Sequence, residues 1–186
     1  HLYKGIPTQA GMGGGSSDCG CMITLLNRQF NLGLSEQQMI DYAAKLGADC
    51  AFFIVNRPVY AEGIGEKMQP IDLDLKGWHL AIVRPAIPVS TKEAFSLITP
   101  CHPAHNCRDI EKQPMETWRG LLTNDFEKSV FAIHPEIGAI KDRLYDMGAV
   151  YAAMSGSGSS LFGLFRSPVD PRAFNEEGTF KTCIAL

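Results

Sequence analysis

The hydrophobic and polar positions along the chain predict several helices. From residue 16 to residue 30, apolar side chains recur every three or four positions, as on one face of a helix. A second helix is expected over residues 35–47, because Ser35 and Gln38 form a capping-box pattern at its start. The same kind of pattern opens a helix over residues 90–98, and an amphipathic stretch predicts another over residues 135–147.

Short apolar runs predict the strands. Residues 51–55 and 59–61 are expected to form a hairpin around a turn at residues 56–58. The polar, proline-containing stretch 99–114 is expected to be a surface loop. Further strands are expected over residues 1–7, 77–85, 149–154 and 161–165.

A glycine-rich loop directly precedes the first predicted helix. Residues 11–18 read Gly-Met-Gly-Gly-Gly-Ser-Ser-Asp, and glycines let backbone N–H groups approach a phosphate at a helix start. ATP is the expected ligand, although no lysine follows as it would in a Walker-type loop. The alternatives are a flexible turn and, for the serines, simple helix capping. The candidate phosphate-binding residues are Gly11, Gly13, Gly14, Gly15, Ser16 and Ser17.

A second small-residue loop separates the last two predicted strands. Residues 155–160 read Ser-Gly-Ser-Gly-Ser-Ser, too short a stretch for a linker between domains. We expect the two loops to form two walls of one nucleotide site, and the alternative is a tight hairpin with no ligand. The candidate residues here are Ser155, Gly156, Ser157 and Gly158.

Composition excludes several functions. The chain has 186 residues, 45% of them hydrophobic, and a net charge of −3 without a basic run, which argues against a nucleic-acid partner. No apolar run approaches the roughly 20 residues of a membrane span, so no membrane partner is expected either. The six irregularly spaced cysteines are expected to be reduced thiols in a cytoplasmic protein. Four zinc-capable side chains lie in residues 101–107, but they are packed too closely in sequence for a tetrahedral site.

Three further residues are candidates for chemistry. Asp49 follows the end of a predicted helix and precedes an apolar run, so its carboxylate could accept a proton, although such a residue is more often a solvated turn residue. Thr91 and Phe95 lie one helical turn apart and therefore on one face. Phe95 is either an aromatic platform for a base or a core residue.

Seven sequence blocks appear along the chain in this order: Lys4-x-Ile-Pro7, Ala10 to Asp18, Leu46-Gly-Ala-Asp-Cys-Ala-Phe-Phe53, Ala61 to Glu66, Val89-Ser-Thr-x-x-Ala-Phe95, Asn124-Asp-Phe-Glu127 and Met154 to Ser159. Together they resemble the GHMP kinase superfamily and, within it, the 4-diphosphocytidyl-2-C-methyl-D-erythritol kinases. The resemblance covers about residues 1–166. It implies an α+β protein of the GHMP kinase fold, with a partial ribosomal-protein-S5-like domain over residues 1–70 and a ferredoxin-like domain over residues 77–186.

The resemblance also implies roles for the residues. ATP would bind the glycine loops, Ser17 would help orient Mg²⁺, and Asp49 would be the catalytic residue. Thr91 and Phe95 would bind the acceptor, whose 2-hydroxyl receives the γ-phosphoryl group in the non-mevalonate route to isoprenoids. Another GHMP kinase, of the homoserine or mevalonate type, is the nearest alternative.

Two departures from the family pattern limit this transfer of roles. The chain begins at His1 as though inside a strand, and it lacks the family's Pro-x-Lys-x-Asn-Leu segment, whose lysine works with the aspartate. We therefore expect roughly the N-terminal third of such an enzyme to be absent and this fragment alone to be poorly active. A non-catalytic nucleotide-binding remnant is the alternative. Cys19 and Gly20 stand where the family usually has alanines. The sequence does not indicate an oligomeric state.

Overall fold

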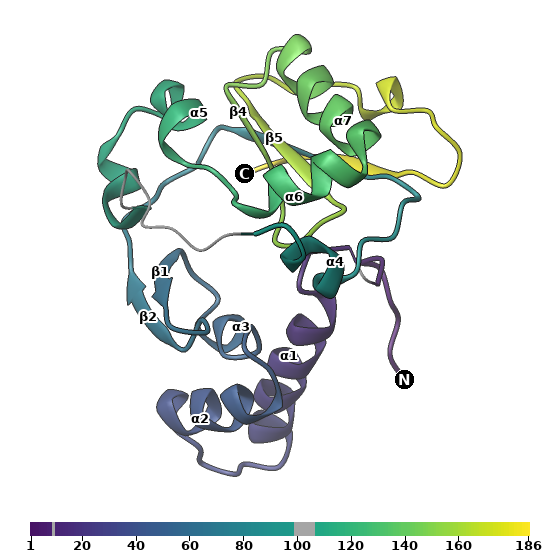
Figure 1. Ribbon diagram of the computed structural model, residues 1–186. Helices are drawn as coiled ribbons and strands as arrows, with labels where there is room; N and C mark the ends of the chain where they lie inside the picture. The colour runs from purple at the N-terminus through teal and green to yellow at the C-terminus, as the bar shows by residue number, and fades with distance from the viewer. Residues whose placement is uncertain (9, 99–106) are drawn as a thin grey trace. The chain divides into compact units, whose positions relative to one another are not determined.

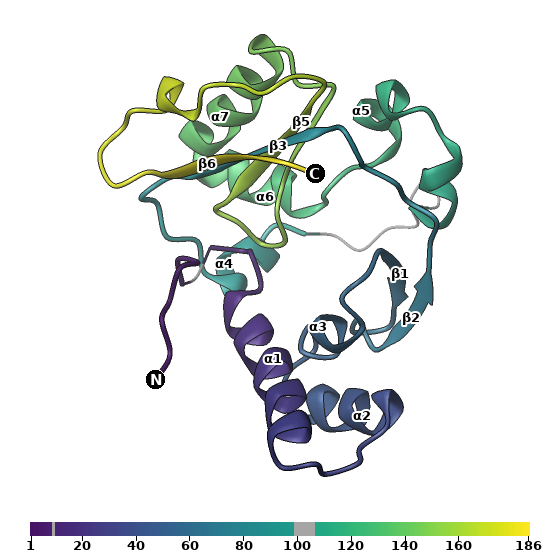
Figure 2. The ribbon, with the colours of Figure 1, turned by 180° about the vertical axis from the view of Figure 1, so that it is seen from behind.

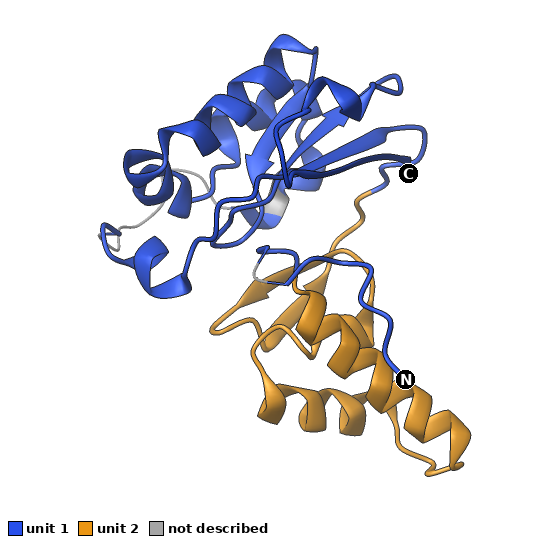
Figure 3. Ribbon diagram, turned by 90° about the vertical axis from the view of Figure 1, so that its right-hand side faces the viewer, with its two compact units in different colours: residues 1–12, 74–186 blue, residues 13–73 orange. Residues whose placement is uncertain are grey.

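The computed structural model describes residues 1–8, 10–98 and 107–186 and divides into two compact units. Figure 3 colours them separately: unit 1 comprises His1–Met12 and Asp74–Leu186, and unit 2 comprises Gly13–Leu73. The boundary at Met12 and Gly13 lies inside the glycine-rich segment, so this segment contributes residues to both units.

Unit 2 is built around two of the predicted helices. Helix α1 spans Gly14–Gln29 and α2 spans Glu36–Leu46. The predicted capping box of α2 is confirmed, since the Ser35 hydroxyl accepts from the Gln38 N–H at 3.2 Å and the Gln38 side chain accepts from the Ser35 N–H at 2.9 Å.

The hairpin predicted for residues 51–61 is wrong. Phe52–Val55 forms a single helical turn, α3, which ends at Asn56 in a left-handed conformation. Strand β1, Val59–Glu62, pairs instead with β2, Lys67–Pro70, in an antiparallel hairpin. An unbroken apolar run does not distinguish a strand from a buried helical turn. Here the buried residues Cys50 and Ala51 pack in a small core with residues of α1 and α2, and that packing favours the helix.

Unit 1 contains a four-stranded antiparallel sheet. Its strands are β3 (His79–Arg84), β4 (Tyr151–Met154), β5 (Leu161–Phe165) and β6 (Phe180–Ala185), in the spatial order β4-β5-β3-β6. Counted along the unit, this is the strand order 4-1-3-2 of a ferredoxin-like sheet. The strands predicted around β3, β4 and β5 are confirmed, and β6 is an additional strand. The strand predicted for residues 1–7 is wrong, because residues 1–8 lie in no helix or strand.

Helices cover one face of this sheet, as the opposite views of Figures 1 and 2 show for α6 and α7. The core between them contains Val130, Ile137 and Leu144 from the helices and Val83 and Leu161 from the sheet. Helix α7 confirms the amphipathic prediction, α4 ends earlier than predicted, and α6 was not predicted. The helices of the unit are α4 (Thr91–Phe95), α5 (Trp118–Leu121), α6 (Phe126–Ile133) and α7 (Pro135–Asp146), with 3₁₀ turns at Cys107–Lys112, Met115–Thr117 and Pro171–Ala173. The α+β class is therefore confirmed.

Candidate active site

The glycine loop forms the start of α1. Gly13 is the N-cap residue in a left-handed conformation, with φ 63° and ψ 19°, and its carbonyl accepts from the Ser17 N–H at 2.8 Å. The N–H groups of the first turn, Gly14 to Ser16, have no carbonyl within the helix to bond, so they are available to an anion. Gly13 at the N-cap makes no side-chain cap bond, and Ser16 and Ser17 lie inside the first turn rather than at the N-cap, so the simple N-capping role considered for these serines is wrong.

Gly11 lies against the second loop, within unit 1. Its φ is +70°, and a Cβ at this position would collide with the carbonyl oxygen of Ser155 and lie 2.8 Å from that of Gly158. The Ser155 hydroxyl donates to the Gly11 carbonyl at 2.8 Å, and the Ser160 N–H donates to the Ala10 carbonyl at 3.2 Å. The structure therefore brings one glycine of the first loop into contact with the second.

The second loop is a tight connection between β4 and β5. The Ser155 N–H donates to the Ser160 carbonyl at 2.8 Å, and the Gly158 N–H donates to the Ser155 carbonyl at 3.0 Å. Gly156 and Gly158 have positive φ values of 53° and 88°. The hairpin considered as an alternative is thus present, and its glycines have the backbone freedom expected of a phosphate-binding loop.

Asp49 lies in the turn between α2 and α3 and is exposed. The segment that follows packs on α1: a Cβ at Gly20 would lie 3.2 Å from the Cys50 carbonyl and 2.8 Å from Cβ of Phe53. A Cβ at Gly13 would lie 3.0 Å from the Phe53 ring. The residues directly after Asp49 therefore contact the helix whose first turn is the glycine loop.

A pair of thiols joins the same two segments. Cys50 is buried, and both burial and its contact with Cys50 raise the pKa of the Cys19 thiol. The Cys19 thiol therefore stays protonated at neutral pH and acts here as a small apolar group.

Thr91 and Phe95 lie on the short helix α4. A capping box fixes its start, since the Ser90 hydroxyl accepts from the Glu93 N–H at 3.1 Å and the Glu93 carboxylate accepts from the Ser90 N–H at 3.4 Å. Phe95 is 57% exposed, so the alternative of a core residue is wrong. Its ring contacts the ring of Phe126 edge to face, with centroids 4.8 Å apart.

Asn124 and Glu127 were not predicted as site residues, yet both hold the start of the second loop. The Asn124 amide donates to the carbonyls of Met154 and Gly156 at 2.8 Å each, and the Glu127 carboxylate accepts from the Met154 N–H at 2.8 Å. The block from Asn124 to Glu127 was one of those carrying the family resemblance. The family resemblance was the signal that could have found these two residues. Hydrogen bonds between residues this distant in sequence leave no periodic pattern.

The described residues contain no cluster of three or more His, Cys, Asp or Glu side chains that could hold a metal ion. Most of the zinc-capable stretch, residues 101–106, lies outside the described residues, and Cys107 is an exposed free thiol.

Two family models match the chain. The model described as "GHMP kinases N terminal domain" matches residues 1–57, and "GHMP kinases C terminal" matches residues 108–177. Together with the ferredoxin-like sheet, these matches define the class as GHMP kinases. Helices long and apolar enough to span a membrane are absent from the described part of the chain.

Comparison with single proteins narrows the class. The chain is 55% identical over 165 residues to a 4-diphosphocytidyl-2-C-methyl-D-erythritol kinase of Bacteroides fragilis, covering 89% of this chain and 60% of that protein. It is 43% identical to the kinase of the same name from Cytophaga hutchinsonii, covering 100% of this chain and 68% of that protein. The chain belongs to this family of GHMP kinases. It spans about 60% of the length of the Bacteroides relative.

Solved structures agree with this assignment. A crystal structure of 4-(cytidine 5'-diphospho)-2C-methyl-D-erythritol kinase matches with a TM-score of 0.79 and 29% identity, covering 99% of this chain and 69% of that one. The homoserine kinase from Cytophaga hutchinsonii matches with a TM-score of 0.65 at 16% identity and supports the fold alone.

Proposed function

We propose that the full gene product containing this chain transfers the γ-phosphoryl group of ATP to the 2-hydroxyl of 4-diphosphocytidyl-2-C-methyl-D-erythritol, with Mg²⁺, in the non-mevalonate route to isoprenoid precursors. The observation that carries the phosphoryl-transfer chemistry is the glycine-capped start of α1, with Asp49 in the turn before the segment that packs on this helix. The identity to the Bacteroides kinase supports the choice of acceptor.

The phosphate groups of ATP fit the first turn of α1. The N–H groups of Gly14, Gly15 and Ser16 and the positive end of the helix dipole would bind the phosphate oxygens, each such charge interaction contributing about 0.3 to 1 kcal/mol. Space around Gly15 is open, since no atom of the described residues, apart from its chain neighbours and its own helix, lies within 4 Å of where its Cβ would be. Gly11 and the residues from Ser155 to Gly158 are proposed as further nucleotide-binding residues.

Ser17 is the proposed protein ligand of Mg²⁺. Its hydroxyl does not cap the helix, so it is available to the ion, and the phosphate oxygens of ATP would supply other ligands. When bound, the ion would neutralise charge that develops on the transferred group.

Asp49 is the proposed base. It is exposed, so an acceptor hydroxyl has access to its carboxylate, and accepting the proton of this hydroxyl would contribute about 10² to 10⁴ in rate. The exposed ring of Phe95 is proposed to stack on cytosine, with Thr91 on the same face of α4 contacting the acceptor. The five described cysteines are free thiols, which supports a cytoplasmic location.

An aspartate substitution tests the proposal. In the full gene product, Asp49→Asn is expected to lower kcat with the cytidyl acceptor by at least about a hundredfold, because asparagine cannot accept the proton. Asp41→Asn is the matched control: Asp41 is exposed on α2 of the same unit, and we expect near-normal turnover. The measurement is steady-state phosphorylation with varied acceptor. Near-normal kcat in Asp49→Asn would remove Asp49 from the role of base.

The choice of acceptor is tested separately. With homoserine, mevalonate and the cytidyl alcohol offered in parallel, we expect phosphorylation of the cytidyl alcohol alone. Preference for homoserine or mevalonate would assign the chain to another GHMP kinase activity. ATP binding without turnover of any acceptor would favour a non-catalytic remnant.

The domain limits at residues 1–70 and 77–186 stay a prediction.

A further inference from the structure

Strand β4 lies at one edge of the sheet in unit 1, so one side of its backbone has no neighbouring strand. Exposed N–H and C=O groups of this kind are normally covered or used for pairing. Here side chains cover them. The Tyr145 hydroxyl bonds both backbone groups of Ala152, accepting from its N–H at 3.2 Å and donating to its C=O at 3.1 Å. The corresponding groups of Met154 bond Glu127 and Asn124.

Asn124 uses three hydrogen-bonding positions at once. Its amide nitrogen donates to the carbonyls of Met154 and Gly156, both at 2.8 Å, and its oxygen accepts from the Phe126 N–H at 3.0 Å. Only a side-chain amide of this length offers two donors and an acceptor in that arrangement. An aspartate of the same shape would lose both donors and place a negative charge against two carbonyl oxygens.

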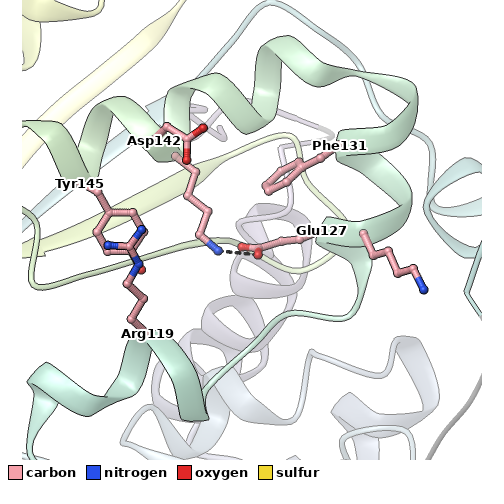
Figure 4. Close-up of a pocket in the computed structure, with 7 residues that line it drawn as sticks. Arg119, Glu127, Phe131, Asp142 and Tyr145 are labelled. Atoms are coloured by element: carbon pink, nitrogen blue, oxygen red, sulfur yellow. Dashed lines mark hydrogen bonds and ion pairs between the residues drawn. The ribbon is translucent and has the colours of Figure 1, made fainter.

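Glu127 also holds Met154, through the backbone N–H of that residue. One carboxylate oxygen accepts from the Met154 N–H, and the other pairs with Lys141 at 2.5 Å. Figure 4 shows Glu127 pointing into the hollow of about 430 Å³ that Arg119, Phe131, Asp142 and Tyr145 also line. The Glu127 side chain is only 12% exposed, so a hydrogen-bonded partner of opposite charge is needed to offset the cost of its burial.

Phe126 connects this anchor to the proposed acceptor residue. It lies between Asn124 and Glu127 at the start of α6, and its ring contacts the exposed ring of Phe95. One turn of chain therefore holds the backbone where the second loop begins and packs against the proposed cytosine platform.

We propose that Asn124 and Glu127 are positioning residues that hold the Ser155–Gly158 loop in its nucleotide-binding conformation. The identity of the nucleotide rests on the proposed function. The ordering of the loop by these two side chains rests on their hydrogen bonds alone. The loop has hydrogen-bonded amides at Ser155, Gly158 and Ser160, so its order is measurable without ligand.

The test compares Asn124→Asp with Asn175→Asp in the full gene product. Asn175 is exposed in the same unit, so its variant introduces the same charge away from the loop. In Asn124→Asp we expect amide exchange at residues 155–160 to accelerate about tenfold or more, because the variant loses the hydrogen bonds that its amide donates. We expect the Kd for ATP to rise about tenfold for the same reason. The KM for the acceptor is expected to stay within about twofold, because an aspartate oxygen still accepts from the N–H of Phe126, whose ring contacts Phe95. General loss of structure would not produce this split. The control is expected to change neither exchange nor ATP binding.

A second pair of variants decides the matter if Asn124→Asp does not fold. Glu127→Gln keeps an oxygen that can accept from the Met154 N–H, whereas Glu127→Ala does not, so the loop is expected to exchange faster in the alanine variant. Unchanged loop exchange in folded Asn124→Asp, or a loosened loop with unchanged Kd for ATP, would overturn the proposal. A wild-type protein that binds no ATP would refute the proposed function and the nucleotide role of these residues, while the exchange comparison would still decide whether they hold the loop.

Discussion

At the residue scale, the glycines of the first loop serve different purposes. Gly11 has a positive φ and no room for a side chain, because the Ser155 carbonyl occupies the space where its Cβ would lie. Gly15 is helical, and the described residues leave the space where its Cβ would lie open, so among them its lack of a side chain has no packing reason. An approaching phosphate would provide one.

We expect Gly11→Ala and Gly15→Ala to have opposite effects on stability. The left-handed backbone alone costs a residue such as alanine about 1 to 3 kcal/mol, and the collision at Gly11 adds to that. Alanine at position 15 favours the helix by up to about 1 kcal/mol. Thermal unfolding of both variants checks this expectation.

Nucleotide binding separates the two variants further. Despite its stability, Gly15→Ala is expected to bind ATP at least about tenfold more weakly, because its methyl group would lie where a phosphate approaches the first turn. ATP titration followed by calorimetry is the measurement. Normal affinity in Gly15→Ala would show that phosphate does not approach this residue.

Phe95 provides a test of the acceptor site. Its ring is 57% exposed, so Phe95→Ala is expected to cost little stability but to raise the KM for the cytidyl acceptor about tenfold through loss of the stacking surface. Leu97→Ala is the control, since Leu97 is 54% exposed and carries no ring. Equal changes in KM for both variants would argue against a stacking role.

At the element scale, local signals predicted the helices with defined ends. Ser35 with Gln38 and Ser90 with Glu93 form capping boxes in the structure, because these bonds join residues three positions apart. The run Phe52–Val55 was predicted wrongly because its conformation depends on packing with α1 and α2. The bonds from Asn124 to the second loop span 30 residues and more, so periodicity could not reveal them.

Tyr151 on β4 makes the stability of the folded state depend on pH. Its hydroxyl donates to the Leu122 carbonyl at 3.0 Å, and burial, with a smaller contribution from Glu127, raises its pKa above the ordinary value of 10.0. A raised pKa means that the folded state favours the neutral phenol. This contribution to stability is therefore complete below about pH 10 and is lost as the pH rises above it.

We expect the free energy of unfolding to fall above about pH 10 in the wild type and to fall less in Tyr151→Phe. At neutral pH the variant is expected to lose about 1 kcal/mol with the bond to Leu122. Denaturant unfolding at a series of pH values is the measurement. Parallel pH profiles for the two proteins would show that Tyr151 does not titrate in the way its burial implies.

At the scale of the whole molecule, each unit carries its own set of proposed residues. Gly13 to Ser17 and Asp49 belong to unit 2, whereas Gly11, the second loop, Thr91 and Phe95 belong to unit 1. The sequence predicted the helix starts at the glycine loop and at the two capping boxes, because these are local features. It did not predict the anchoring of the second loop by Asn124 and Glu127, which depends on the folded arrangement of unit 1.

The proposed mechanism requires a cation beside the aspartate, and this requirement can be measured. In the family that the chain resembles, the catalytic aspartate works with a lysine in a Pro-x-Lys-x-Asn-Leu segment. Residues 1–186 contain no such segment. Without that cation, we expect these 186 residues alone to turn over the cytidyl acceptor at least about a hundredfold more slowly than the Bacteroides fragilis relative assayed beside them. Fusing the N-terminal portion of that relative, which this chain does not cover, to residue 1 is expected to restore turnover. The same fusion carrying Asp49→Asn is the control and should remain inactive. Efficient turnover by the 186 residues alone would mean that their own side chains stabilise the transferred phosphoryl group without the lysine.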